Sequence, residues 1–177
     1  MDAPDNFKRL LLAAIPRLRR YARSLVFDGP RADDLVQSTL ERALTRWQQF
    51  DERRDLLLWL LSIAHNAHQD GLRRDARLSM LEPERMEQEL DRQAGAAQPP
   101  DIGLRLDLLA ALRTLTPELR EPLLLVVVEQ LSYAEAAQVL RIPPGTVMSR
   151  ISRARLLLRR VLGDGKPPSR SHLRRVV

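Results

Sequence analysis

The sequence contains no cysteine, which excludes disulfide bonds, thiol nucleophiles and cysteine-ligated metal sites. Aromatic residues make up only 4% of the chain, so a core must be built mainly from leucine, alanine, valine and isoleucine. Together with abundant arginine and glutamate, these residues favour helices over sheets. No apolar run approaches the roughly 20 residues of a membrane-spanning helix, and the N-terminal segment lacks a run long enough for a signal peptide. We therefore expect a helical, soluble, cytoplasmic protein without membrane insertion.

Positive charge is concentrated toward the end of the chain. The 29 basic and 23 acidic residues give a net charge of +6. The net charge is +3 over residues 1–74, −4 over 75–103 and +7 over 104–177. A basic segment of this kind favours a polyanionic partner, with nucleic acid as the first candidate. An arginine-rich surface that is merely solvated would have the same composition.

Hydrophobic periodicity predicts an all-α fold of two small helical domains. Apolar residues recur at helical spacing before residue 74 and again after residue 104. Between them the chain is acidic, then rich in alanine, glycine and glutamine, and it contains Pro99 and Pro100. We predict a first domain at 1–74, a flexible linker at 75–103, a second domain at 104–162 and a basic tail at 163–177.

Two local features of the second domain can be predicted. Thr116 stands before Pro117, a pairing that is typical of a helix N-cap followed by its first residue. Valines at 126–128 are poor helix formers, and three in succession predict a fully buried segment.

The segment LSYAEAAQVLRIPPGTVMSRISRARLLLRR, residues 131–160, predicts two crossing helices. Ser132 and Glu135 form an S-x-x-E capping box for the first helix, and Pro143-Pro144-Gly145 are expected to stop it. In the second helix, apolar residues fall on one arc and arginines on an adjoining one. This pattern is typical of a helix-turn-helix whose second helix enters the major groove of DNA. A helical hairpin with a solvated basic face is the alternative. The expected DNA-binding residues are Thr146, Ser149, Arg150, Arg153 and Arg155.

These residues resemble the fourth conserved region of bacterial sigma factors, whose pattern is LSYEEIAEILGVPVGTVKSRLHRAR. Earlier in the chain, DDLVQSTLERALTRW resembles the polymerase-binding helix of the second region. LLLWLLSIAHNAHQDGLRR resembles the helix that grips the −10 promoter element. A linker stands where housekeeping sigma factors have a third region, which is the layout of the extracytoplasmic-function class. The resemblance implies that the chain binds core RNA polymerase and promoter DNA, and that an anti-sigma factor controls it.

The resemblance also assigns roles to particular residues. It implies −35 recognition by the second helix of the helix-turn-helix, and a pocket for an extruded base at loop 48–54. The polymerase-binding residues are expected to be Asp34, Leu35, Val36, Gln37 and Glu41. The −10 residues are expected to be Asn66, Asp70, Arg73 and Arg74. From the residues alone, the acids and the arginines could merely complement helix dipoles.

Several residues depart from the family pattern. His65, His68 and Met148 stand where the family has other side chains, which leaves the promoter sequence open. Gly71 is expected to weaken its helix by up to about 1 kcal/mol relative to alanine. His65 and His68 are three residues apart, a spacing found in metal sites, but no third ligand is evident. We therefore predict no metal and no other cofactor.

Two other functions remain open at this point. No residues resemble a nucleophile–base pair or a phosphate-binding glycine loop, so we predict neither enzymatic activity nor a small-molecule substrate. A sigma-like decoy that captures an anti-sigma factor is one alternative. A dimeric helix-turn-helix repressor is the other, although it would not explain the segments at 33–47 and 56–74.

Overall fold

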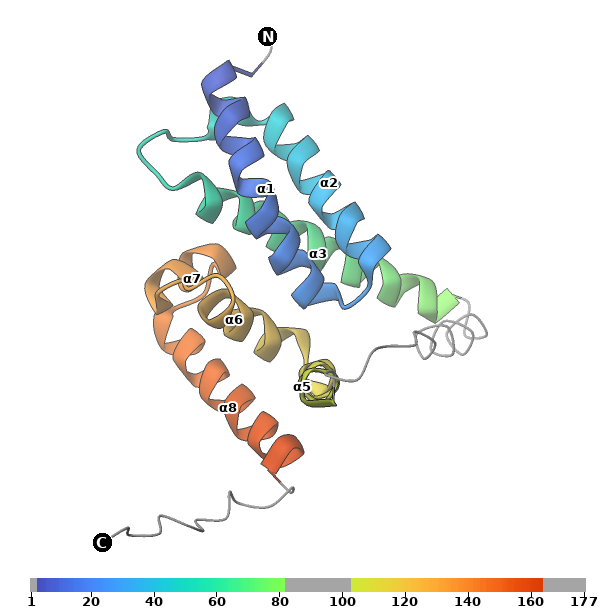
Figure 1. The fold of residues 1–177 in the computed structure, drawn as a ribbon. Coiled ribbons are helices and arrows are strands. Elements are labelled where there is room, and N and C mark those ends of the chain that lie inside the picture. The colour runs from blue at the N-terminus through green and yellow to red at the C-terminus, as the bar shows by residue number, and fades with distance from the viewer. Residues whose placement is uncertain (1–2, 82–102, 164–177) are drawn as a thin grey trace, which may run out of the picture.

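The computed structural model describes residues 3–81 and 103–163, and within them it contains helices but no strand. Figure 1 shows the helices of the first domain grouped together, with those of the second domain packed beside them. This confirms the all-α class and the two helical domains. The first domain contains α1 (Asp5–Val26), α2 (Gly29–Thr45), a 3-10 turn (Trp47–Gln49) and α3 (Leu56–Leu81). The second contains α5 (Gly103–Thr114), α6 (Pro117–Val127), α7 (Tyr133–Leu140) and α8 (Pro144–Gly163).

Side-chain caps set the start of two helices in the first domain. The Asp28 carboxylate accepts the backbone N–H of Arg31 at 2.8 Å and so caps α2. Asp55 precedes α3 and accepts the N–H of Leu57 at 2.7 Å. The third helix continues to Leu81, beyond the predicted boundary at residue 74. The rest of the predicted linker, at 82–102, and most of the predicted tail lie outside the described residues.

The helix-turn-helix has the predicted cap but a different turn. Ser132 accepts the N–H of Glu135 at 3.2 Å, and the Glu135 carboxylate accepts the N–H of Ser132 at 2.8 Å. This confirms the capping box. The first helix ends because Arg141 adopts a left-handed conformation with φ 54°, before the prolines are reached. Gly145 already belongs to α8, so the Pro-Pro-Gly sequence starts the second helix and does not stop the first.

Of the two local predictions in the second domain, one is confirmed and one is wrong. Thr116 occupies the N-cap position of α6 and Pro117 is the first helical residue, as predicted, although the Thr116 side chain makes no capping hydrogen bond. The valine segment is not fully buried, because Val127 is 51% exposed while Val126 and Val128 are partly buried. The side of α6 that carries Val127 faces solvent at the end of the helix. Burial is therefore set by the neighbouring helices and not by the apolar run itself.

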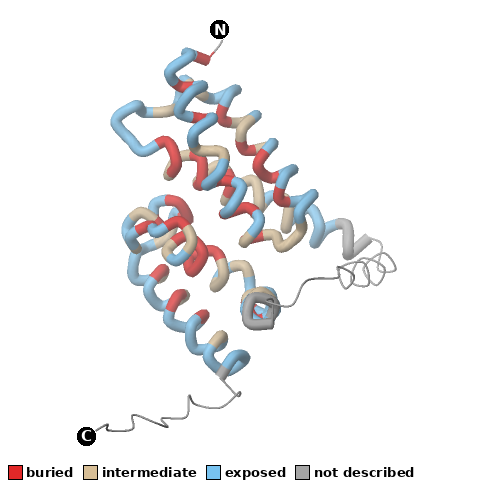
Figure 2. Tube along the Cα trace, in the orientation of Figure 1, coloured by how far each residue is buried: buried red, intermediate tan, exposed pale blue. Residues whose placement is uncertain are grey.

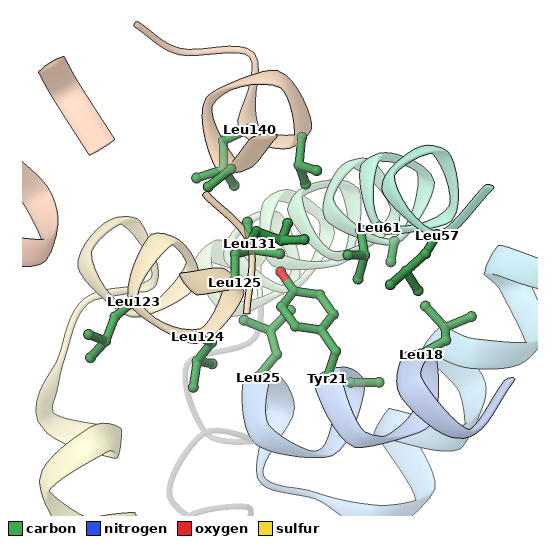
Figure 3. Packing of buried hydrophobic residues seen from close by; sticks show 14 of the residues in the cluster. Leu18, Tyr21, Leu25, Leu57, Leu61, Leu123, Leu124, Leu125, Leu131 and Leu140 are labelled. Atoms are coloured by element: carbon green, nitrogen blue, oxygen red, sulfur yellow. The ribbon is translucent and has the colours of Figure 1, made fainter. Parts of the chain in front are cut away.

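The two domains share one continuous apolar core. Helix α6 packs against α1, and α7 packs against α3. Figure 2 shows buried residues on the facing sides of the two domains, and Figure 3 shows leucines from both domains around Tyr21. The buried core residues at this junction are Tyr21, Leu25, Leu61, Leu124, Leu125, Leu131 and Leu140. The domains are therefore packed together in this structure and do not behave as two independent bodies.

A second cluster fixes the loop that precedes α3. Phe7 lies 5.8 Å from Phe50 and 6.2 Å from Trp59, measured between ring centroids. Phe50 and Trp59 are 5.4 Å apart. Tilted and edge-on aromatic contacts at these distances are favourable. The partly buried Trp59 thus packs against the apolar cluster, and these contacts anchor one end of loop 48–54 against α1.

Gly71 should weaken α3 without a compensating contact. A Cβ built at this position meets nothing within 4 Å. We expect Gly71→Ala to raise the free energy of unfolding by about 0.5–1 kcal/mol, because alanine loses less backbone entropy in a helix. Urea titration followed by circular dichroism measures this change. Gly145→Ala, also in open space but in the first turn of α8, should change stability less. An equal or destabilising effect of Gly71→Ala would contradict the expectation.

Candidate nucleic-acid interface

Helix α8 buries one side and presents the other to solvent. Val147, Ile151 and Ala154 are at most 1% exposed, so they hold the helix on the domain. In Figure 1, α6 and α7 lie between α8 and the first domain, which leaves α8 at the outer edge of the molecule. Met148 is 55% exposed and lies on this free surface. An exposed, anchored helix after a tight turn has the geometry for insertion in a major groove.

The predicted −35 residues do not all lie on the same face of α8. Ser149 and Arg153 are exposed, and Thr146 and Arg150 are partly buried. The Ser149 hydroxyl donates its proton to the carbonyl of Thr146 at 3.0 Å. Its oxygen therefore remains available as a hydrogen-bond acceptor for a binding partner. Arg155 is also exposed, but two residues of helix place it about 160° around the axis from Arg153. These two arginines therefore cannot both point into one groove.

The predicted −10 residues lie on the C-terminal half of α3. Arg73 and Arg74 are exposed, whereas Asn66 is partly buried. The Asp70 carboxylate forms an ion pair with Arg42 of α2 at 3.5 Å, and both side chains remain partly exposed to solvent. Exposed pairs of this kind contribute little stability, so Asp70 and Arg42 remain available to a partner. The surface combines two exposed cations, Arg73 and Arg74, with the polar pair of Asp70 and Arg42.

The predicted polymerase segment divides into core and surface residues. Leu35 is 8% exposed and Val36 is 4% exposed, so they pack inside the first domain. Helix periodicity turns these two side chains toward α1 and α3, so a contact between them and the polymerase stays a prediction. Asp34, Gln37 and Glu41 are exposed on the other side of α2. Gln37 donates to the Glu41 carboxylate at 2.9 Å, which orients both side chains.

The structure brings part of the polymerase set and part of the −10 set together. Asp34 and Arg74 line one groove of about 380 Å³ between α2 and α3, to which Arg120 of the second domain also contributes. Beside loop 48–54, a second pocket of about 420 Å³ is lined by Phe50, Glu52 and residues of α1. The −35 set on α8 lies apart from both cavities.

Sequence reasoning missed a charged contact between the domains. The Glu129 side chain is fully buried, yet it carries a carboxylate. Arg17 of α1 approaches one carboxylate oxygen at 3.1 Å and donates to the Glu129 carbonyl at 2.9 Å. Arg20 donates to the other oxygen at 3.1 Å and 3.2 Å. No signal in a single sequence pairs residues that lie more than 100 positions apart.

The two unassigned histidines also face the second domain. His65 Nδ1 lies 2.9 Å from the Glu121 carboxylate, which is 2% exposed and also accepts from Gln69 at 3.2 Å. Desolvation by burial lowers the pKa of His68, and the nearby Arg120 and His65 add to this effect while Glu121 and Asp75 oppose it. Within the described ranges, no group of three or more histidine, aspartate or glutamate side chains could hold a metal ion. In the same ranges, no helix is long and apolar enough to cross a membrane.

Two family models match the chain, one in each domain. The model described as sigma-70, region 4 matches residues 105–158. The model described as the Sigma2 domain of PhyR matches residues 11–65. The first match includes the predicted −35 residues, while the second includes the predicted polymerase-binding residues and ends at residue 65, just before the predicted −10 residues.

Similar proteins span nearly the whole chain. The ECF RNA polymerase sigma factor EcfG of Rhodopseudomonas palustris is 35% identical over 162 residues, which cover 92% of this chain and 88% of that protein. The RNA polymerase sigma factor CarQ of Myxococcus xanthus is 30% identical over 162 residues, which cover 92% of each chain. The solved sigma factor RpoE of Bartonella quintana, in complex with the anti-sigma factor NepR, matches with a TM-score of 0.75 at 32% identity. That match covers 92% of this chain and 100% of the other.

His68 should make stability depend on pH. Its pKa in the folded chain lies below the ordinary value of 6.5, so between these two values the unfolded chain binds more protons. Stability must then fall as the pH drops below about 6.5. We expect the stability of the parent chain relative to His68→Gln to decrease from pH 7.5 to pH 5.5, as measured by urea unfolding. A difference that is constant or grows toward acid pH would contradict this assignment.

Proposed function

Since this chain belongs to the extracytoplasmic-function class of RNA polymerase sigma factors, we propose that its three exposed surfaces carry the separate steps of promoter recognition. The observation that supports the proposal most directly is the order of the surfaces. A polar face on α2, a basic end on α3 and an outward helix α8 occur in the family's order along one chain. It binds core polymerase and promoter DNA, and it catalyses no reaction of its own.

The exposed face of α2 docks on the polymerase. Asp34 and Glu41 present carboxylates and Gln37 an amide, a set that suits a basic, hydrogen-bonding partner surface. Leu35 and Val36 support this face from beneath, because their burial fixes the rotation of α2. The acidic face is rigid, since it lies on a helix that is packed against both α1 and α3.

The basic end of α3 holds the −10 element. Arg73 and Arg74 are exposed and can bind phosphates, which carry most of the affinity in protein–DNA contacts. Asn66 and Asp70 offer the polar groups that can read an exposed base edge. Opening a duplex requires holding bases out of the stack at a cost of a few kcal/mol each. The pocket beside loop 48–54 is a concave, partly apolar site that suits an unstacked base.

Helix α8 reads the −35 duplex. Arg150 and Arg153 lie on the solvent-facing arc with Thr146 and Ser149. Arginine can bond both acceptor atoms of guanine in the major groove, while hydroxyl groups bond phosphate oxygens. Arg155 points to another side of the helix and, in this proposal, approaches the phosphate backbone at the groove edge.

An anti-sigma factor controls the chain. Similar solved chains include the sigma factor RpoE in complex with the anti-sigma factor NepR, and CnrH in complex with the cytosolic domain of CnrY. The decoy alternative is not favoured, because relatives that match 92% of this chain are named sigma factors. A reconstituted assay with purified core polymerase tests this choice. A sigma factor gives initiation at a defined start site, a decoy gives none, and a repressor lowers initiation by another sigma factor.

Removing Arg150 should weaken −35 binding. We expect Arg150→Ala to cost about 1–3 kcal/mol in affinity for a −35 duplex if it contacts a base, and to reduce the salt slope by about one if it contacts phosphate. Fluorescence anisotropy at several salt concentrations separates the two outcomes. Core polymerase binding should stay unchanged.

Arg159→Ala is the matched control for this variant. Arg159 is exposed, carries the same charge and lies nine residues later, about 180° around α8 from Arg150. Equal losses in the two variants would show that only the total charge of α8 matters, and groove reading by Arg150 would be refuted.

Reversing the charge of Asp34 should weaken polymerase binding. We expect Asp34→Arg to reduce association with core polymerase by about tenfold or more, because like charges then face each other across the interface. Asp33→Arg is the control, since the Asp33 carboxylate pairs with Arg19 of α1 at 3.3 Å and points to a different side. A native pull-down titration measures both. Unchanged binding of Asp34→Arg would exclude this face of α2 from the polymerase interface.

A further inference from the structure

Met148 stands in the part of α8 from which a recognition helix reads DNA. The helix begins at Pro144, and Met148, in its first turns, is 55% exposed. Helices that enter the major groove contact base edges mainly with the residues of their N-terminal turns. In these turns Val147 and Ile151 are at most 1% exposed, so they fix the rotation of the helix on its domain. Met148 is therefore held on a rigid element, at the end of α8 that can reach a base.

The exposed face of these first turns is polar except at Met148. Ser149, Ser152 and Arg153 are exposed on it. Residues four apart are neighbours on a helix surface, so Met148 lies beside Ser152, and Ser149 lies beside Arg153 in the adjoining row. The face opposite the buried side therefore carries two hydroxyl groups, one guanidinium group and one thioether.

A single methionine in this setting suits DNA better than a protein partner. Along α8 the next exposed large apolar residue is Leu156, which lies about 12 Å further on. Surfaces that dock proteins usually carry contiguous apolar patches of several hundred Å². The first turns of α8 offer one apolar side chain among serines and an arginine. This face is therefore too polar for a hydrophobic docking site, but it has room for one apolar contact within a hydrogen-bonding interface.

The chemistry of methionine restricts what this side chain can read. A thioether has no proton to donate and is only a weak acceptor, so it cannot pair with the hydrogen-bonding groups of a base edge. Thymine is the base that presents an apolar group in the major groove, its C5 methyl. A lysine at this position, as in the pattern GTVKSR, would instead donate to the acceptor atoms of guanine. Met148 can therefore discriminate between bases only through contact with a methyl group.

We propose that Met148 is a specificity-determining residue of α8, which contacts the C5 methyl group of a thymine in the −35 element. The contact removes two apolar groups from water and so favours thymine over the other three bases at this position. Arg153 lies about 7.5 Å further along the helix, or about two base-pair steps, so the two side chains read different base pairs. The inference rests on the proposed function of α8 as the helix that reads the −35 duplex.

Removal of the methyl group from the DNA tests the contact without any change to the protein. A promoter mapped in the reconstituted assay supplies the −35 sequence, and each of its thymines is replaced in turn by uracil, which lacks only the methyl group. We expect one replacement to lower the affinity of the full chain bound to core polymerase by about fourfold, because one apolar group leaves a buried contact. Met148→Ala should bind the thymine and uracil forms equally at this position. If every replacement leaves the affinity of the parent unchanged, or if Met148→Ala keeps the difference, the contact is refuted.

Selection from promoters randomised across the −35 element tests the specificity. At the position where the parent selects thymine, Met148→Lys should select guanine, because lysine donates to the guanine acceptors. Leu156→Lys is the matched control, since Leu156 is 50% exposed on the same helix but lies beyond the first turns. Its added charge should strengthen binding to every sequence and leave the base preference as it is. Sequencing of the bound DNA measures both variants, and an unchanged preference of Met148→Lys would overturn the proposal.

Two controls separate this inference from the proposed function. A parent chain that gives no initiation with core polymerase would refute the proposed function and this inference with it. A parent chain that initiates at a −35-dependent promoter, while the Met148 variants keep its base preference, would refute the role of Met148 alone. Unchanged DNA selection with weaker core polymerase binding in Met148→Lys would assign the residue to a protein contact and overturn the proposal. Far-ultraviolet circular dichroism checks that the variants fold, and the uracil measurement on the parent chain needs no variant.

Discussion

Glu129 places a negative charge inside the molecule, and it can stay there only while Arg17 and Arg20 cover it. This requirement fixes how α6 lies against α1, and therefore how the second domain sits on the first. The apolar contact around Tyr21 buries surface of both domains. It does little to fix their relative orientation, because the hydrophobic effect is not directional. The alignment of the two domains thus depends on a few charge-assisted bonds at the edge of a larger apolar contact.

The two surfaces proposed to bind DNA are not equally accessible while the domains are packed together. Helix α8 lies on the far side of the second domain, so the −35 surface is open in this arrangement. The basic end of α3 is less free, since the same helix uses His65 and Gln69 to contact Glu121. The residues of α3 that we propose to face DNA begin at Asn66, one position away from that contact. The helix proposed to open DNA is therefore also the helix that the second domain contacts.

The elements of the fold could be predicted because their signals are local. Ser132 and Glu135 are three residues apart and cap a helix wherever it packs. The burial of Leu35 and Val36 was also accessible, since with Ala32, Thr39 and Ala43 they follow one helical stripe. The position of Arg155 follows from helix geometry in the same way. The pairing of Glu129 with α1 could not be found, because it depends on how distant helices meet.

The contact of Glu129 with Arg17 and Arg20 joins residues that lie more than 100 positions apart in the sequence. Nothing in the chemistry of Arg17 and Arg20 requires the carboxylate to come from the same molecule. At high concentration, two chains could therefore exchange second domains and form every interdomain contact twice, in an interlocked pair. In such a pair, neither copy could dissociate without breaking the contacts of both. The concentration of the pair would rise with the square of the monomer concentration.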